Sequence, residues 1–318
     1  MNNEELLPIK AKSQFNHHDL VTISQLTDTD ITNILDVAEA MKEVSNREVK
    51  KIPALRGKTI INYFLEPSTR TRTSFEIGAK RLFADLVNIS GKSSSMTKGE
   101  SFRESLRTLE AMKPDLIVIR SASAGIPSQA TKWINCPIVN GGDGRHEHPT
   151  QALLDLFTIR NHFGTFEGLK VLIVGDIANS RVARSNLIGM KTLNIERSIC
   201  SPPQLMPAKA ELMADKVFYN LKEAIKGVDV VIALRIQKER LLESWLPSTR
   251  EYANNYQINQ SILKLANRNA ILLHPGPVNA GIELDQETIY NHRSLILEQV
   301  TNGIAIRMAI LFLLLSKH

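Results

Sequence analysis

Hydroxyl and guanidinium side chains gather in one short segment, which follows an apolar run that ends at Phe64. Ser68 is placed to cap a helix there, and a helix N-terminus offers unpaired backbone N–H groups and the positive end of the helix dipole. Thr69, Arg70 and Thr71 add two hydroxyls and a positive charge to the same turn. The segment is therefore a candidate phosphate site. The alternative is an ordinary capped amphipathic helix with a solvated basic face.

Further donors follow other apolar runs in the first half of the chain. Arg120 comes directly after such a run, and His148 and Gln151 follow a glycine-rich turn at residues 141–144. Loops at strand ends are suited to ligand contact, so these three side chains are candidate binding residues. His146 and His148 do not predict a zinc site, because the HExxH motif sets its two histidines one helical turn apart.

The second half of the chain carries two arginines at comparable places. Arg181 follows the apolar run at residues 170–174, and Arg235 follows the run at residues 228–234, with Gln237 close behind. Because a guanidinium presents a planar fork of donors that suits a carboxylate, the two arginines are candidate carboxylate-binding residues on separate loops. The alternative for Arg235 is a charged surface turn. The glycines of a GxGxxG loop are missing before Arg181, which disfavours a dinucleotide.

A proline-rich turn follows the apolar run at residues 271–273. It reads His274-Pro275-Gly276-Pro277, and its two prolines around a glycine make the turn rigid. A backbone carbonyl in this turn is therefore a candidate acceptor for an amine or an amide.

Helical patterns separate these apolar runs. The alternation predicts an α/β fold of two consecutive domains, each a mostly parallel sheet flanked by helices. Strands of the first half are expected at residues 59–64, 86–89, 116–119 and 138–139. Strands of the second half are expected at residues 170–174, 195–200, 228–234 and 271–273. The candidate residues fall after these strands, where open parallel sheets bind their ligands.

The domain boundary is expected just after His148. Residues 1–148 would form the first domain and residues 149–302 the second, because a helical pattern begins at Pro149 without a flexible linker before it. Asn302-Gly303 is expected to precede a last helix, residues 303–318, that joins the first domain.

Composition limits the class of protein. The chain has 318 residues, 43% hydrophobic and 23% charged, which is typical of a soluble globular protein. Its net charge of +6 comes from scattered Lys and Arg residues, which disfavours nucleic-acid binding. The apolar stretch at residues 304–315 contains Arg307 and is shorter than the ~20 residues that cross a bilayer. With no export signal in MNNEELLPIK, we expect a cytoplasmic protein with no membrane partner, in which Cys136 and Cys200 are reduced structural thiols.

The run Phe64-Leu65-Glu66-Pro67-Ser68-Thr69-Arg70-Thr71-Arg72 resembles the carbamoyl-phosphate signature of the aspartate and ornithine carbamoyltransferase family. The resemblance extends from about residue 20 to the C-terminus. It implies a first domain that binds carbamoyl phosphate and a second that binds L-aspartate. The implied activity is transfer of the carbamoyl group to the α-amino group of aspartate, an early step of pyrimidine biosynthesis, with no cofactor.

The resemblance also implies which residues contact carbamoyl phosphate: Ser68, Thr69, Arg70, Thr71, Arg120, His148, Gln151, Gly276 and Pro277. In the family the Ser-Thr-Arg-Thr residues hold the phosphate, and the glutamine contacts the amide. Thr71, Arg120 and His148 would donate to the carbonyl oxygen and stabilise the negative charge that forms on it. The implied catalytic residues are Arg70, Thr71, Lys98, Arg120 and His148.

The implied aspartate-binding residues are Lys98, Arg181, Arg235 and Gln237. Arg181 would contact the α-carboxylate, and Arg235 the side-chain carboxylate. Ser94 and Lys98 are implied to enter the active site of a neighbouring subunit. The expected assembly is therefore a homotrimer with shared active sites, and the resemblance allows for separate regulatory chains.

Other interpretations stay open. An ornithine carbamoyltransferase shares the first domain, but its second-domain motif is a His-Cys-Leu-Pro turn, which this chain lacks at His274-Pro275-Gly276-Pro277. Arg235 would also repel a cationic acceptor, which disfavours ornithine and, as a more distant alternative, a modified ornithine. A catalytically silent binding paralogue would be expected to have lost Arg70, Lys98, Arg120 or His148, and all four are present.

Overall fold

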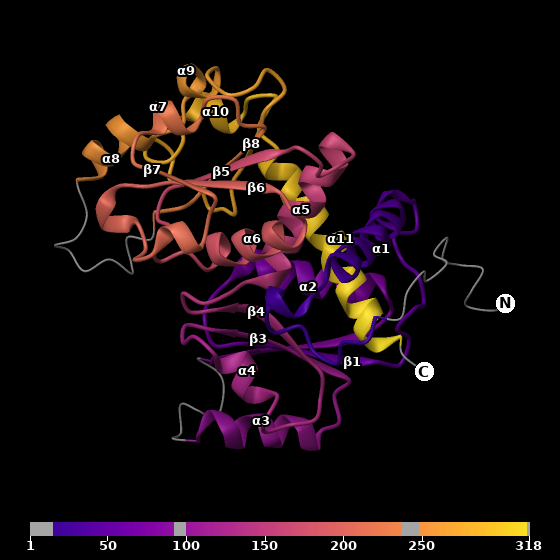
Figure 1. Cartoon of the computed structure of the whole chain (residues 1–318). Helices are drawn as coiled ribbons and strands as arrows, with labels where there is room; N and C mark the ends of the chain where they lie inside the picture. The colour runs from indigo at the N-terminus through magenta and orange to yellow at the C-terminus, as the bar shows by residue number, and fades with distance from the viewer. Residues whose placement is uncertain (1–14, 92–99, 237–247, 317–318) are drawn as a thin grey trace. The chain divides into compact units, whose positions relative to one another are not determined.

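The computed structural model describes residues 15–91, 100–236 and 248–316, and these divide into two compact units (Figure 1). Unit 1 contains the described residues up to Phe157 together with those from Val300 onward. Unit 2 contains the described residues of Thr158–Gln299. Both chain crossings fall inside helices: α5 (Pro149–Phe163) leads from unit 1 into unit 2, and α11 (Ile296–Leu315) leads back.

Unit 1 is built on a four-stranded parallel sheet in the order β2-β1-β3-β4. Its strands are β1 (Thr59–Phe64), β2 (Asp85–Ser90), β3 (Leu116–Ser121) and β4 (Ile138–Asp143). Strands β1, β3 and β4 are almost entirely buried, as expected for parallel strands that are covered by helices on both faces. Strand β2 lies at an edge of the sheet and is partly exposed.

Helices cover both faces of this sheet (Figure 1). Besides α5 and α11, the helical segments of unit 1 are η2 (Ile23–Gln25), α1 (Asp28–Asn46), α2 (Thr69–Arg81), α3 (Phe102–Ala111) and α4 (Ile126–Ala130). On one face, apolar residues of α3 and α4 form a single cluster with alternate residues of β1 and β3. On the other face α2 lies against α11, where a side-chain carbon at Gly78 would meet Met308 at 3.4 Å.

Unit 2 is built on a five-stranded parallel sheet in the order β7-β6-β5-β8-β9. Its strands are β5 (Lys170–Val174), β6 (Glu196–Cys200), β7 (Lys216–Phe218), β8 (Val230–Ala233) and β9 (Ile271–Leu273). Its helical segments are α6 (Arg181–Thr192), η5 (Pro203–Leu205), η6 (Ala210–Leu212), α7 (Leu221–Ala224), α8 (Thr249–Tyr256), α9 (Gln260–Leu263) and α10 (Gln286–Ile289). The predicted fold class, two consecutive α/β units with parallel sheets, is therefore confirmed.

Helix α11 differs from the sequence-based expectation. It begins at Ile296 and runs through Asn302-Gly303, which were expected to precede it. A side-chain carbon at Gly303 would lie 2.6 Å from Nη1 of Arg307, so any larger residue at this position would require the guanidinium to shift. Arg307 is buried, donates to the Gly303 carbonyl at 2.8 Å and lies 5.3 Å from the centre of the Phe75 ring. Among the described residues α11 alone is long and apolar enough to cross a bilayer, but it is mostly buried within the protein, like the core helix of a soluble protein.

Each sheet has one pair of neighbouring strands from which the chain connections leave in opposite directions. In unit 1 this pair is β1 and β3, because β2 lies on one side of them and β4 on the other. In unit 2 it is β5 and β8, with β6 and β7 on one side and β9 on the other. Ligands of open α/β sheets bind beyond the carboxyl ends of strands at such a switch point. The loops that follow β1, β3, β5 and β8 should therefore carry binding residues.

Candidate active site

The candidate phosphate segment connects β1 to α2. Ser68 caps α2: its hydroxyl accepts from the backbone N–H of Thr71 at 3.4 Å, and its carbonyl accepts from that of Arg72 at 3.2 Å. Thr69 and Arg70 are exposed, whereas Thr71 is buried. The positive end of the helix dipole, a guanidinium and several hydroxyls therefore occupy one accessible turn, which suits an anion.

Arg120, a residue of β3, contacts both the loop that follows β1 and the neighbouring strand β4. It is buried near the end of β3, and its carbonyl accepts from Leu65 N–H at 2.8 Å. Its Nη2 donates to Oε1 of Glu66 at 2.9 Å, and its Nη1 donates to the carbonyl of Gly141 at 2.9 Å. The ion pair with Glu66 brings Arg120 to the segment that also contains Ser68. Arg120 is thus held in a fixed orientation at the switch point of unit 1.

His148 and Gln151 lie at the start of α5, just after the loop that follows β4. His148 is buried, and its Nδ1 is 3.4 Å from the hydroxyl of Thr150. Its carbonyl accepts from Gln151 N–H at 3.0 Å. The side chain of Gln151 donates to Oδ1 of the buried Asp155 at 2.9 Å. The candidate residues of unit 1 thus come from the ends of neighbouring strands.

In unit 2, Arg181 is the first residue of α6 and is buried. The turn before it is fixed by Asp176, whose carboxylate accepts from the backbone and the side chain of Asn179 at 3.1 and 2.9 Å. Ser180 caps α6 by accepting from Ala183 N–H at 3.1 Å. Arg181 therefore projects from a well-ordered turn beyond the end of β5.

Arg235 follows β8, the neighbour of β5, and is half-buried. The N–H of the preceding Leu234 donates to the carbonyl of Val174 in β5 at 2.8 Å. Arg181 and Arg235 therefore flank the switch point of unit 2. The two arginines thus lie in separate segments after neighbouring strands, and their positions after two strands were predicted from the sequence.

The Gly276-Pro277 turn is linked to the Arg235 loop by Glu283. This buried carboxylate accepts from Ile236 N–H at 2.9 Å, and from the backbone and side chain of Asn279 at 3.1 and 2.8 Å. Gly276 has a φ of +63°, which favours glycine, and its N–H donates to Nδ1 of His274 at 2.8 Å. Two predicted binding loops therefore share one buried carboxylate.

Burial raises the pKa of the Glu283 carboxyl above its ordinary 4.5, although hydrogen bonds from its own backbone N–H, from Ile236 and from Asn279 oppose the shift. The folded protein therefore holds this proton more tightly than the unfolded chain does. The resulting stability is complete below pH 4.5 and is lost as pH rises through the folded pKa.

A Glu283→Gln variant should lack this pH dependence. The quantity to compare is the difference in unfolding free energy, wild type minus variant, obtained from urea unfolding at a series of pH values. We expect this difference to fall as pH rises above 4.5. Glu211→Gln, at an exposed position of the same unit, should give a flat difference. A flat difference for Glu283→Gln as well would contradict the raised pKa.

Three predicted site residues, Ser94, Lys98 and Gln237, lie outside the described residues. Their expected contacts stay predictions.

The part of the chain that the structure describes offers neither a candidate metal site nor a readily ionised thiol. It contains no group of three or more His, Cys, Asp or Glu residues that could hold a metal ion. His146 is instead paired with Asp143, at 3.0 Å between Nδ1 and Oδ2. Burial raises the pKa of the thiols of Cys136 and Cys200 to about 12, so both stay protonated near neutral pH.

Four carboxylates that hold the candidate loops had no role in the sequence analysis: Glu66, Asp143, Glu147 and Glu283. Each lies within or close to a motif that was recognised for other residues. The clue in the sequence is an acidic residue inside a strand-end motif that is otherwise apolar or basic. One sequence does not reveal that such a residue is buried, and burial is what makes it an anchor.

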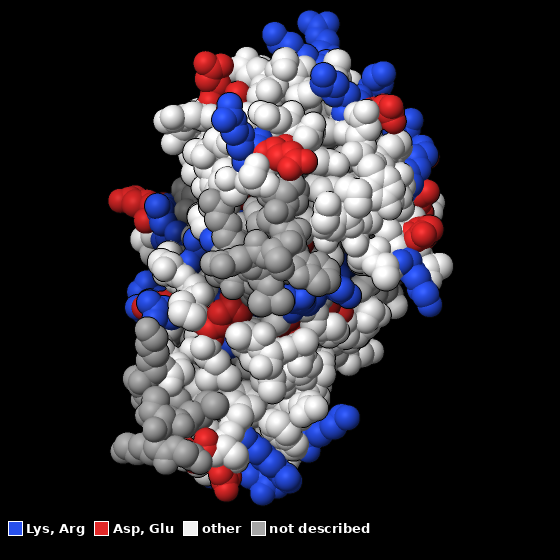
Figure 2. Space-filling model, turned by 90° about the vertical axis from the view of Figure 1, so that its left-hand side faces the viewer, with Lys and Arg blue, Asp and Glu red and all other residues white. Residues whose placement is uncertain are grey.

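Surface charge is mixed on the face drawn in Figure 2, where Lys and Arg side chains are interspersed with Asp and Glu. On the described part of that face, the charges do not form a continuous basic stripe of the kind that tracks a nucleic-acid backbone.

Two doubly wound α/β units, each with hydrogen-bond donors or arginines at its switch point, place the chain among two-domain α/β enzymes that bind anionic substrates. Residues 18–161 match the carbamoyl-phosphate-binding domain of aspartate/ornithine carbamoyltransferases, and residues 167–314 match the Asp/Orn-binding domain. The chain therefore belongs to the aspartate/ornithine carbamoyltransferase family, a family of carbamoyl-group transferases.

Two similar sequences belong to the aspartate branch of the family. The chain is 49% identical over 299 residues to an aspartate carbamoyltransferase catalytic subunit of Geobacter sulfurreducens, covering 94% of this chain and 96% of the relative. It is 50% identical over 298 residues to the corresponding subunit of Moorella thermoacetica, covering 94% and 97%.

Similar solved structures include both branches. Aspartate transcarbamoylase of Trypanosoma cruzi, in complex with carbamoyl aspartate and phosphate, has a TM-score of 0.84 and 28% identity, covering 97% of this chain and 98% of that one. Ornithine carbamoyltransferase of Pyrococcus furiosus has a TM-score of 0.85 and 26% identity, covering 94% and 97%. Because the two TM-scores are nearly equal, the backbone alone does not distinguish the acceptors.

Proposed function

We propose that this chain transfers the carbamoyl group of carbamoyl phosphate to the α-amino group of L-aspartate, giving N-carbamoyl-L-aspartate and phosphate, an early step of pyrimidine biosynthesis. The observation that carries the proposal is the 49% identity, over 94% of the chain, to a relative named as an aspartate carbamoyltransferase catalytic subunit. Arg181 and Arg235 support a dicarboxylate acceptor, because both flank the switch point of unit 2 and a guanidinium binds a carboxylate bidentately.

In this proposal unit 1 binds carbamoyl phosphate. The open N-terminus of α2, with Ser68, Thr69, Arg70 and Thr71, binds the phosphate. Arg120 and His148, with Thr71, donate to the carbonyl oxygen. Gln151 contacts the amide. The accessible helix N-terminus and the fixed orientation of Arg120 support these roles.

Unit 2 binds aspartate in the same proposal. Arg181 contacts the α-carboxylate and Arg235, with Gln237, the side-chain carboxylate. The carbonyls of Gly276 and Pro277 contact the carbamoyl NH2 or the incoming amine. The link between the Arg235 loop and the Gly276-Pro277 turn through Glu283 supports this assignment, since it fixes one loop relative to the other.

The reaction then needs no cofactor. The neutral α-amino group attacks the carbonyl carbon, a C–N bond forms, and negative charge develops on the carbonyl oxygen. Donors already in place stabilise that charge without reorganising, which is the main source of catalysis in such a site. The C–O bond to phosphate then breaks, and the departing phosphate accepts the proton that the amine loses.

A product assay tests the proposed activity. The purified chain is incubated with carbamoyl phosphate and either L-aspartate or ornithine, and the carbamoylated product is identified by mass spectrometry. We expect N-carbamoyl-aspartate. Citrulline would reassign the acceptor to ornithine, and release of phosphate at the rate of spontaneous hydrolysis would favour a silent binding paralogue.

We also propose a cytoplasmic homotrimer in which Ser94 and Lys98 enter the active site of a neighbouring subunit. A complementation experiment tests the sharing. Lys98→Ala and Arg120→Ala chains should each be nearly inactive alone, and mixed trimers should regain activity because some sites then contain Lys98 from one chain and Arg120 from the other. No recovery in mixed trimers, checked by light scattering, would contradict shared sites. Light scattering of the protein isolated from cell extract would show whether regulatory chains are attached to the trimer.

A further inference from the structure

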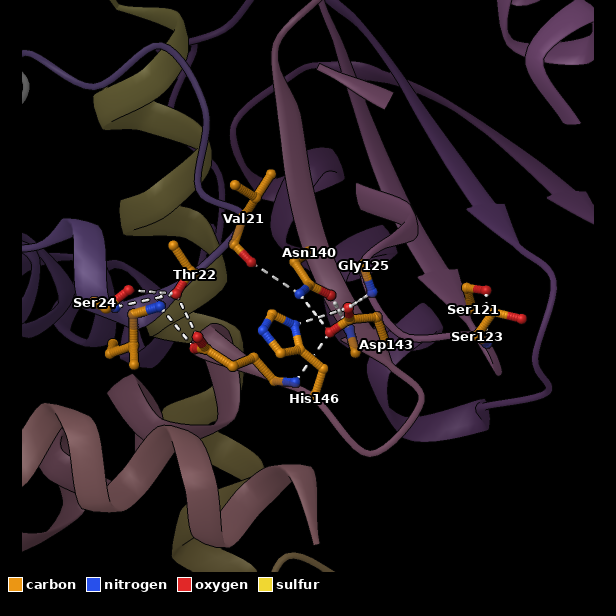
Figure 3. Close-up of polar contacts among 12 residues, drawn as sticks. Val21, Thr22, Ser24, Ser121, Ser123, Gly125, Asn140, Asp143 and His146 are labelled. Atoms are coloured by element: carbon orange, nitrogen blue, oxygen red, sulfur yellow. Dashed lines mark hydrogen bonds and ion pairs between the residues drawn. The ribbon is translucent and has the colours of Figure 1, made fainter. Parts of the chain in front are cut away.

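Asp143, the last residue of β4, is a buried carboxylate surrounded by nitrogen atoms (Figure 3). Its Oδ1 accepts from the side chain of Asn140 at 2.9 Å and from Glu147 N–H at 3.0 Å. Its Oδ2 accepts from Gly125 N–H at 2.6 Å and lies 3.0 Å from Nδ1 of His146. Each oxygen therefore has two partners, which is close to the acceptor capacity of a carboxylate.

Two of these partners, Gly125 and Glu147, lie in different loops, and Asn140 lies in β4 itself. Gly125 lies in the loop that follows β3, shortly after Arg120, whereas Glu147 lies in the loop that follows β4 and directly precedes His148. The side chain of Asp143 therefore bridges the loop after Arg120 and the loop before His148. Arg120 itself contacts strand β4 through the carbonyl of Gly141, two residues before Asp143.

The backbone of the second loop closes around the same residue. Asp143 N–H donates to the Glu147 carbonyl at 3.0 Å, and His146 N–H donates to the Asp143 carbonyl at 2.9 Å. Gly144 has a φ of +47°, and a side-chain carbon there would lie 2.7 Å from the backbone nitrogen of Ala124 in the first loop. The two loops are thus in close contact, and little space is left for the second to shift.

Glu147 fixes the far side of the loop. Its Oε2 accepts from Ile23 N–H at 2.8 Å, and its Oε1 accepts from the hydroxyl of Thr22 (Figure 3). The residue before His148 is therefore held by the segment around η2 as well as by Asp143. The start of α5, and with it the backbone of His148, is anchored from two directions.

We propose that Asp143 is a positioning residue, whose carboxylate sets the loop that carries His148 at a fixed distance from the loop that follows Arg120. The inference rests on the proposed function, in which Arg120 and His148 donate to the same carbonyl oxygen. Misplacing a catalytic group by about 1 Å can lower the rate by about 10²-fold. Asp143 touches neither substrate in this proposal, so its effect reaches the reaction through His148.

An Asp143→Asn variant tests the inference, because it keeps the size of the side chain but turns one acceptor oxygen into an NH2 group that faces a backbone N–H, that of Glu147 or of Gly125. We expect kcat to fall about 10- to 100-fold. The KM for aspartate should stay within about twofold, since Arg181 and Arg235 are unaltered. The milder His146→Ala removes one partner of Oδ2 and should give a smaller fall in kcat.

Asp115→Asn is the matched control. Asp115 precedes β3, at the opposite end of the sheet, and accepts from Thr59 N–H at 2.8 Å and from Lys58 at 2.9 Å. The control should lose stability but keep its kcat. Equal losses of kcat in the two Asp→Asn variants, or an unchanged kcat in Asp143→Asn, would overturn the positioning role.

A second readout separates this inference from the proposed function. In protein with 15N-labelled histidine, the ring signals of His148, assigned with His148→Gln, should move in Asp143→Asn and His146→Ala but stay in place in Asp115→Asn. If the wild-type chain made no N-carbamoyl-aspartate while these signals moved, the proposed function would fail and the positioning of His148 would stand. Unmoved signals would overturn the positioning even in an active enzyme.

Discussion

Replacing His148 by alanine is expected to lower kcat about 10²-fold, the usual effect of removing one donor from an oxyanion site. The reason is that His148 is buried next to the end of β4, on a loop that is already fixed, so no other group can easily replace it. The measurement is the rate of N-carbamoyl-aspartate formation with both substrates saturating.

His162→Ala is the control for that experiment. His162 lies on the same helix, α5, but is exposed, and its loss should leave kcat unchanged. Wild-type turnover in His148→Ala would show that His148 is not a catalytic residue. Thr71 and Arg120 would then be the donors to the carbonyl oxygen.

Replacing Arg235 by alanine is expected to raise the KM for aspartate by about 10²-fold, because breaking a partly buried charge pair typically costs about 3 kcal/mol. The KM for carbamoyl phosphate should change by less than about threefold, since Arg235 belongs to the unit that binds the other substrate in our proposal. Initial rates with each substrate varied in turn measure both constants.

Arg250→Ala removes the same charge from an exposed position on α8 of the same unit, so it controls for the change in net charge. It should leave both KM values unchanged. If Arg235→Ala weakened the use of carbamoyl phosphate as much as that of aspartate, the assignment of the second unit to aspartate would be wrong.

Sequence patterns predicted the parts of the fold that local physics determines. Most parallel strands of this chain are short apolar runs, and all eight expected strands are found near their predicted residues, including the partly exposed β2. Strand β7 was not expected, because only two of the three residues of Lys216–Phe218 are apolar, whereas all three residues of the equally short β9 are. The cap at Ser68 was predicted for the same local reason: a hydroxyl at that place satisfies the first N–H groups of the helix that follows.

Features that depend on distant residues were not predictable. Gly303 indicated a helix boundary, but it lies inside α11, where the guanidinium of Arg307 occupies the space beside it. The anchoring roles of Asp143 and Glu283 likewise depend on partners from other loops, such as Gly125 and Ile236. Propensity and spacing carry information about neighbours in the chain, and these contacts form only when the sheet brings the loops together.

Helix α11 returns to unit 1 only after the chain has passed through unit 2. It contributes buried side chains to unit 1, among them Ile306, Met308 and Ile310. During synthesis on the ribosome, unit 2 has therefore left the exit tunnel before unit 1 receives this helix. The apolar side of α2 around Phe75 and Gly78 is uncovered during this time, and such a nascent chain is exposed to aggregation and to capture by chaperones until α11 has emerged from the tunnel.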